Sequence, residues 1–340
     1  MRFLERNNYY SGYYYRRRNY RSLYEIIVKF IIIWTIAYVL TCAFLYFRQD
    51  YLLYRSDLEM ATSYPSDRDF QLDYQNTWIN VPNSPARIHG WWFRAPNSKM
   101  PVVPLTKEPV DVLTTEGDQP VTTPKTILYL GGKGGSKTHY NSLTRIQSLH
   151  QLGFSVLGID YRGYGLSEGR LPNESRLYED SQAAWDYLTN QRKIAPQDII
   201  IYGESLGGAI AIDLAVQQKD AGGLIVQSSF TSMPEQIQNI RPGLKVFPLW
   251  LIINQRFNSL EKVPFLDVPV LFLHGTADTI VDYKMSRKLY YAAPEPKTLF
   301  YIPGGKHLTL YQPGKHSYLG AIEKFVEESV EPTKITRANY

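Results

Sequence analysis

From residue 126 onward, short runs of consecutive apolar residues alternate with longer segments of helix-favouring composition. Strands that are apolar at every position are typical of parallel sheets covered on both faces. Alternation with helices favours right-handed crossovers and a doubly wound sheet, whose functional loops lie at the carboxyl ends of the strands. The sequence therefore predicts an α/β fold with a mostly parallel sheet flanked by helices. The predicted strands are 126–130, 155–160, 198–202, 223–227, 269–274 and 298–302, and the predicted helices are 141–152, 175–191, 206–217, 282–292 and 318–330.

Two further strands are expected before this core, at 74–81 and 86–94, and their spacing predicts an antiparallel pair. The segment 97–125 is rich in Pro and Thr and has little periodicity, so we interpret it as a surface excursion and not as a domain linker. We place one domain at 70–330, preceded by a juxtamembrane segment at 48–69 and followed by a frayed tail at 331–340.

A different apolar pattern occupies residues 26–47, where Lys29 is the only charged residue and the last 18 positions carry no charge. At about 1.5 Å per residue, a helix of this length nearly crosses a hydrocarbon core. A buried core helix would show a polar face. A cleaved signal peptide is the other alternative, but the run is long for one and no small-residue cleavage site follows it. We predict an uncleaved transmembrane helix.

Charge is concentrated in the arm that precedes this helix, residues 1–25. The chain has 37 Lys and Arg against 32 Asp and Glu, a net charge of +5, and residues 1–24 hold six arginines against one glutamate. The rest of the chain is near neutral, so we expect no nucleic-acid partner. Positive charge before the helix predicts a cytoplasmic N-terminus. We expect residues 8–21 to lack regular structure, with an anionic lipid surface as an alternative location. Cys42 is the one cysteine and leaves the redox compartment undetermined.

The candidate chemistry centres on Gly203-Glu-Ser-Leu-Gly207, which follows a predicted strand and opens a predicted helix. Glycines two residues on either side of Ser205 allow strand and helix to approach, and the turn exposes the serine hydroxyl. A serine nucleophile needs a base and an acid that orients the base. Asp278 and His307 follow later strands, in the order Ser, Asp, His that this architecture uses.

Each partner has a competitor. Asp278 could instead cap the following helix, and Asp282 is an alternative acid. His316 competes with His307, although we interpret it as solvated surface, and we interpret His274 as a packed strand end. For the oxyanion, we predict the backbone N–H groups of Leu206 and of Lys133, the latter in the glycine-rich loop 131–135. The loop lacks a phosphate-binding motif, and no histidine pair has metal-ligand spacing, so we expect neither a cofactor nor a metal.

Residues 70–330 resemble the alpha/beta hydrolases, and within them the membrane-anchored alpha/beta-hydrolase-domain branch, often labelled serine-aminopeptidase-like. The resemblance rests on Gly203–Gly208, on the contexts of Asp278 and His307, and on two further runs, Asp160-Tyr-Arg-Gly-Tyr-Gly-Leu-Ser-Glu-Gly169 and Ser228-Ser-Phe-Thr-Ser232. It implies a Ser205, Asp278, His307 triad and acyl transfer to water. Two departures are Gly131-Gly132, where relatives commonly have His-Gly, and Leu308, where they have Asn.

The resemblance also implies that the insertion at about 231–267 forms a helical cap over the nucleophile. Its apolar run, 247–253, beside a membrane anchor favours a substrate with an acyl chain, although these residues could only pack the cap on the core. We therefore expect a membrane-anchored serine hydrolase for esters or thioesters of a lipid or acylated molecule. The alternatives are a peptidase of the serine aminopeptidase type and a non-catalytic membrane scaffold.

Overall fold

The structure is a computed structural model that describes residues 8–54, 64–96, 125–133, 137, 139–310 and 315–330. These residues form two compact units. One holds the N-terminal helix up to Gln49 together with Phe247–Asn254, and the other holds the remainder. Residues 97–124 of the predicted excursion and the tail at 331–340 lie outside the described residues.

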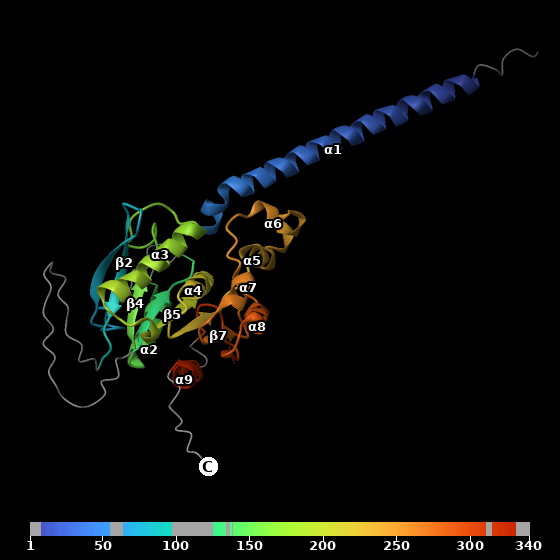
Figure 1. Cartoon of the computed structure of the whole chain (residues 1–340). Helices are drawn as coiled ribbons and strands as arrows, with labels where there is room; N and C mark the ends of the chain where they lie inside the picture. Colours follow the sequence, from blue (N-terminus) through green and yellow to red (C-terminus); the bar gives the residue numbers. More distant parts are fainter. Residues whose placement is uncertain are drawn as a thin grey trace, which may run out of the picture. The chain divides into compact units, whose positions relative to one another are not determined.

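The larger unit is built on one eight-stranded sheet in the order β1-β2-β4-β3-β5-β6-β7-β8 (Figure 1). The first two strands are antiparallel to each other, and β2 is antiparallel to β4, while all pairs from β4 to β8 are parallel. The strands are β1 (Gln75–Asn80), β2 (Arg87–Phe93), β3 (Thr126–Leu130), β4 (Ser155–Ile159), β5 (Ile199–Glu204), β6 (Gly223–Gln227), β7 (Val270–Gly275) and β8 (Lys297–Ile302). All eight predicted strands are confirmed, with bounds that differ by no more than two residues.

Helices cover both faces of this sheet, as continuous apolar strands require. The α-helices of this unit are α2 (Tyr140–Gln151), α3 (Glu174–Asp186), α4 (Leu206–Gln217), α5 (Met233–Ile240), α7 (Ser259–Lys262), α8 (Tyr283–Ala292) and α9 (Lys315–Phe325). Two π-helical turns, η1 (Tyr187–Gln191) and η5 (Val326–Val330), extend α3 and α9, and short 3-10 turns are η2 (Pro196–Asp198), η3 (Pro242–Val246) and η4 (Val263–Phe265). The insertion predicted as a helical cap thus consists of short helices and turns.

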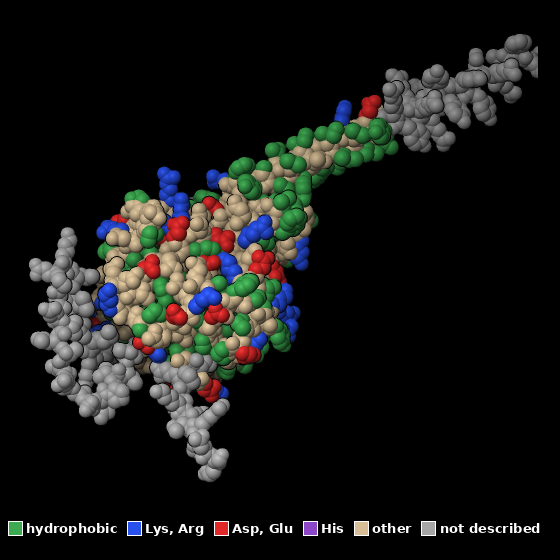
Figure 2. Space-filling model, in the orientation of Figure 1, with side chains coloured by type: hydrophobic (Ala, Val, Ile, Leu, Met, Phe, Trp, Pro, Cys, Tyr) green, Lys and Arg blue, Asp and Glu red, His purple; other side chains and the backbone are tan. Residues whose placement is uncertain are grey.

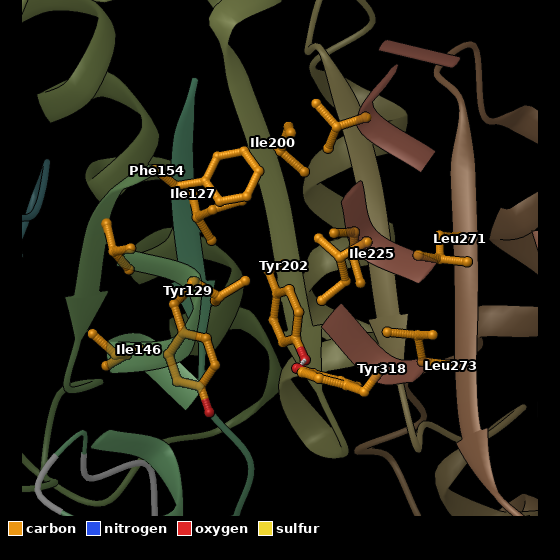
Figure 3. Close-up of a cluster of buried hydrophobic side chains, with 14 of the residues drawn as sticks. Ile127, Tyr129, Ile146, Phe154, Ile200, Tyr202, Ile225, Leu271, Leu273 and Tyr318 are labelled. Atoms are coloured by element: carbon orange, nitrogen blue, oxygen red, sulfur yellow. Dashed lines mark hydrogen bonds between the residues drawn. The ribbon is translucent and has the colours of Figure 1, made fainter. Parts of the chain in front are cut away.

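One large core lies on the sheet face packed by α2 and α9 (Figure 3). Ile127 and Tyr129 point into it from β3, Ile200 and Tyr202 from β5, and Ile146 from α2. The hydroxyls of Tyr202 and Tyr318 lie 2.6 Å apart in this cluster, which ties α9 to the central strand. Because the carboxyl ends of β5, β7 and β8 meet at one edge of this rigid sheet, the loops that follow them have fixed positions.

The N-terminal helix α1 (Asn8–Tyr54) includes the apolar stretch 26–47. It is long and apolar enough to cross a membrane, and its most apolar window is not buried by protein. Figure 2 shows hydrophobic side chains over the visible face of its described part. The expectation that residues 8–21 lack regular structure is wrong, because α1 already begins at Asn8. Once the apolar stretch has formed a helix, each added residue gains a hydrogen bond without a new nucleation cost.

Candidate active site

The structure brings Ser205, His307 and Asp278 together at the carboxyl edge of the sheet. Ser205 Oγ lies 3.0 Å from His307 Nε2, and His307 Nδ1 lies 2.7 Å from Asp278 Oδ2. A carboxylate only accepts, so Nδ1 carries the hydrogen of the neutral imidazole and Nε2 accepts from the serine hydroxyl. His307 is only 7 % exposed. This arrangement can remove the serine proton and stabilise the resulting imidazolium.

The turn between β5 and α4 places Ser205 in a backbone conformation that side chains rarely adopt, with φ 54° and ψ −117°. The Ser205 N–H donates to the Gln227 carbonyl at 2.8 Å, and the Ser205 carbonyl accepts from the Ser229 hydroxyl at 2.8 Å. Tight packing surrounds the turn: a Cβ at Gly207 would lie 2.1 Å from the Leu130 carbonyl oxygen. Glycine is needed here because neighbouring backbone occupies the place of a side chain.

Asp278 is held by more than the histidine that the sequence predicted. Its Oδ1 accepts the backbone N–H groups of Ile280 and Val281, at 2.8 and 2.9 Å. Its Oδ2 lies 3.2 Å from Nε2 of His274, a fully buried side chain at the end of β7. Burial works against the carboxylate, but the hydrogen bonds from His274 and His307 outweigh it and hold the pKa of Asp278 well below its ordinary value.

The two competitors have other places in the structure. Asp282 caps α8 and accepts the Lys284 N–H at 2.9 Å, and His316 is exposed in the first turn of α9. The interpretation of His274 as a packed strand end is confirmed but incomplete. Its Nδ1 lies 2.6 Å from the Ser286 hydroxyl, so the ring is fixed on both sides and Nε2 faces Asp278.

The glycine-rich loop after β3 approaches the serine. A Cβ at Gly132 would lie 3.2 Å from Ser205 Cβ and 3.8 Å from its Oγ, so Gly132 runs directly beside the hydroxyl. Lys133 is the next residue, and Leu206 is the first residue of α4, whose N-terminal N–H groups favour negative charge. The rest of the predicted loop, Gly134 and Gly135, lies outside the described residues.

A buried ion pair that sequence reasoning missed supports the turn between β5 and α4. Arg145 on α2 donates through Nη2 and Nε to both carboxylate oxygens of Glu204, with the Nε bond at 2.9 Å, and the Tyr129 hydroxyl donates to Glu204 at 2.7 Å. Arg145 Nη1 also reaches the Leu308 carbonyl at 3.4 Å. This arginine therefore contacts the residue before the serine and the residue after His307.

A second missed pair joins two loops at the same edge. The Asp160 carboxylate accepts both the backbone N–H of Lys137, at 2.9 Å, and the Lys137 ammonium, and it also accepts the Leu166 N–H at 3.1 Å. The ammonium lies 4.6 Å from the centre of the Trp91 indole ring. Burial lowers the pKa of Lys137, although the Asp160 charge opposes the shift. The pair fixes the loop after β3 against the loop after β4.

Among the described residues, no group of three His, Cys, Asp or Glu side chains is arranged to hold a metal ion. The chemistry that the geometry offers is that of an activated hydroxyl next to a glycine-lined backbone, which suits attack on a carbonyl carbon.

Comparison with known proteins agrees with the fold. The solved structure of the Pyrococcus furiosus esterase Pf2001 superposes with a TM-score of 0.61 at 17% identity, covering 81% of this chain and all of that chain. An alpha/beta hydrolase from Vibrio vulnificus superposes with a TM-score of 0.57 at 23% identity, covering 74% of this chain and 81% of that one. At these identities the likeness shows the fold alone.

Relatives in sequence cover a similar part of the chain. An uncharacterized protein of Mycobacterium tuberculosis, Rv2307c, is 37% identical over 203 residues, which is 60% of this chain and 70% of that protein. The alpha/beta hydrolase domain-containing protein WAV2 of Arabidopsis thaliana is 27% identical over 284 residues, 79% of this chain and 84% of that protein. The model of the Hydrolase_4 family, described as serine aminopeptidase S33, matches residues 123–262 and 252–314. The chain therefore belongs to the Hydrolase_4 family of alpha/beta hydrolases.

Proposed function

We propose that this chain is a membrane-anchored serine hydrolase that cleaves carboxylic ester or thioester bonds of a lipid or acylated substrate. The observation that carries the proposal is the continuous hydrogen-bonded chain from Ser205 through His307 to Asp278. Family membership and the fold of the Pyrococcus furiosus esterase support hydrolysis.

In the proposed reaction, His307 takes the proton of Ser205 as its Oγ attacks the acyl carbon. Asp278, kept ionised by its hydrogen bonds, stabilises the imidazolium. The Lys133 and Leu206 N–H groups bind the oxyanion, and collapse of the intermediate passes the proton from His307 to the leaving alcohol or thiol. Water then attacks the acyl-enzyme by the same route. Removing one such oxyanion donor typically costs about 10²–10³ in rate.

An acylated substrate is supported by the apolar character of the insertion, where Phe265 is 67% exposed. Burying each methylene of an acyl chain against such a surface is worth about 0.8 kcal/mol. The anchor is α1, and its arginine-rich start supports a cytoplasmic N-terminus with the hydrolase on the opposite side. The mass of the mature protein distinguishes an uncleaved anchor from a signal peptide.

The test is covalent labelling of the full chain in detergent micelles with a fluorophosphonate probe, followed by mass spectrometry of the modified peptide. We expect labelling at Ser205 that disappears in Ser205→Ala. The matched control is Ser228→Ala: this buried serine directly after β6 also has a positive φ, of 48°, but its hydroxyl makes no hydrogen bond to the triad. It should retain labelling.

Undiminished labelling of Ser205→Ala would refute the nucleophile assignment. A folded wild type that neither reacts nor turns over any ester would favour a non-catalytic scaffold. Comparison of matched acyl esters, acyl thioesters and aminoacyl amides then separates the proposed activity from the peptidase alternative, which predicts faster turnover of the amide.

A further inference from the structure

A short apolar segment of the insertion packs along the N-terminal helix. Phe247–Asn254 and α1 up to Gln49 form one compact unit. The Phe247 ring stacks on Tyr38, with centroids 5.2 Å apart and planes at 15°, and Gln49 Oε1 accepts the Asn254 N–H at 2.8 Å. The middle of the segment is the helix α6 (Leu249–Ile252).

These two contacts fix how the segment runs along the helix. Gln49 lies just past Phe47, where the uncharged stretch of α1 ends, whereas Tyr38 lies 11 residues before Gln49. At about 1.5 Å per residue the two levels are about 16 Å apart, about half of a 30 Å hydrocarbon core. If α1 spans a bilayer, Asn254 lies at the boundary of the membrane and Phe247 lies near its middle.

The composition of the segment suits that environment. Residues 246–253 are eight consecutive apolar residues, and no acidic residue occurs between 236 and 260. Val246, Trp250 and Leu251 are 69, 64 and 63% exposed, and these side chains would contact water in a soluble protein. The exposed Arg256 follows the run two residues after Asn254, where a basic side chain can reach headgroups.

The backbone N–H groups of the segment have hydrogen-bond partners within the protein, as an environment without water requires. The N–H groups of Leu249, Leu251, Ile252 and Ile253 donate to carbonyls within the segment, at 2.8–3.1 Å, and the Asn254 N–H donates to Gln49. Pro248 has no N–H. Backbone groups inside a bilayer need such internal partners, because each unsatisfied group costs several kcal/mol.

We propose that residues 246–253 are a second membrane-inserted element. This element lies beside α1 and enters the leaflet on the hydrolase side. The inference rests on the proposed function for the membrane anchor and extends it. The occupant of the exposed Trp250 and Leu251 surface is the acyl region of the bilayer. The insertion is thereby held in the lipid through residues 246–253.

The test uses the full chain with Cys42→Ser as background, because Cys42 is the one cysteine. A single cysteine is introduced as Leu251→Cys, and the protein is labelled with an NBD fluorophore and reconstituted into phosphatidylcholine–phosphatidylglycerol vesicles. Leu40→Cys, in α1 and 63% exposed, is the control for the anchor. Tyr291→Cys, in α8 and 72% exposed, is the control for an exposed aromatic outside this unit. Fluorophosphonate labelling confirms that each variant is folded.

We expect doxyl-labelled lipid to quench NBD at 251 and at 40 at least about twofold more strongly than at 291. Iodide, which quenches from the water, should quench NBD at 291 more strongly than at 251 and 40. Quenching at 251 equal to that at 291, with strong lipid quenching at 40, would overturn the inserted segment and leave the anchor intact. Equal quenching at all three positions would overturn both the anchor and this inference.

A second measurement avoids labelling. In a Trp34→Phe background, Trp250 is the one tryptophan left outside the hydrolase unit. Brominated lipid should quench the tryptophan emission of this protein, and Trp250→Phe should remove most of that quenching. Quenching that is unchanged by Trp250→Phe contradicts the proposal.

Discussion

Replacing Arg145 with methionine should destabilise the protein strongly and in a pH-dependent way. Arg145 and Glu204 are 2 and 4% exposed, so the substitution leaves a buried carboxylate whose remaining partner is the Tyr129 hydroxyl. Breaking a buried pair from one side typically costs 3–5 kcal/mol. We therefore expect a loss of about 3–5 kcal/mol at pH 7.

The sign of the pH dependence follows from the same carboxylate. In Arg145→Met the unpaired charge of the buried carboxylate disfavours the fold most at neutral pH, so the destabilisation should be larger at pH 7 than at pH 5. The destabilisation should shrink by up to about 1.4 kcal/mol per pH unit between pH 7 and pH 5. Urea unfolding of the full chain in micelles at both pH values, followed by tryptophan emission, measures it.

Two variants control this experiment. Arg145→Met combined with Glu204→Gln removes both charges and should recover most of the loss, because no buried charge is left unpaired. Arg287→Met, an exposed arginine on α8, should change stability by no more than about 0.5 kcal/mol. A loss below about 1 kcal/mol for Arg145→Met, or the same loss at pH 5 and pH 7, would mean that the pair does not act as a buried charge pair.

Two further predictions concern the site itself. Because the folded-state pKa of Asp278 is depressed, its contribution to stability is present above its unfolded pKa of about 3.9 and is lost as the pH falls toward the folded pKa. Between pH 5 and pH 3, Asp278→Asn should therefore lose less stability than the wild type, by up to about 1.4 kcal/mol per pH unit. Asp282→Asn should keep the wild-type dependence of stability on pH. The same dependence in both variants would contradict the assignment. Gly207→Ala should cost more than about 2 kcal/mol and slow fluorophosphonate labelling, because its Cβ would meet backbone at 2.1 Å. Gly320→Ala in α9, where a Cβ meets nothing within 4 Å, should be neutral or stabilising by up to about 1 kcal/mol, and similar stabilities of the two variants would refute the packing argument.

Local signals in the sequence account for the sheet and for the positions of Ser205, Asp278 and His307. Buried parallel strands are apolar at every position, and the Gly-x-Ser-x-Gly turn needs two glycines at a fixed spacing, so both features can be recognised within a few residues. Chain order then selects the loops for the acid and the base. The structure brings these three side chains together as that reasoning expects.

The supporting pairs have no such local signal. Arg145 lies 59 residues from Glu204 along the chain and occupies a helix in which an arginine would ordinarily be exposed. Lys137 and His274 likewise acquire their roles only through partners that the fold brings near. The contact of Phe247 with Tyr38 joins residues more than 200 positions apart, so the apolar run in the insertion was predicted but its neighbour was not.

The Asp160 carboxylate has a consequence for how this chain can vary during evolution. It accepts from the backbone and the side chain of Lys137 and from the Leu166 N–H, and a Cβ at Gly165 would lie 2.1 Å from its Oδ2. Three positions on two loops thus depend on one side chain. Drift at any one of them is constrained by the others, and Lys137, Asp160 and Gly165 should be inherited or replaced together as a single unit.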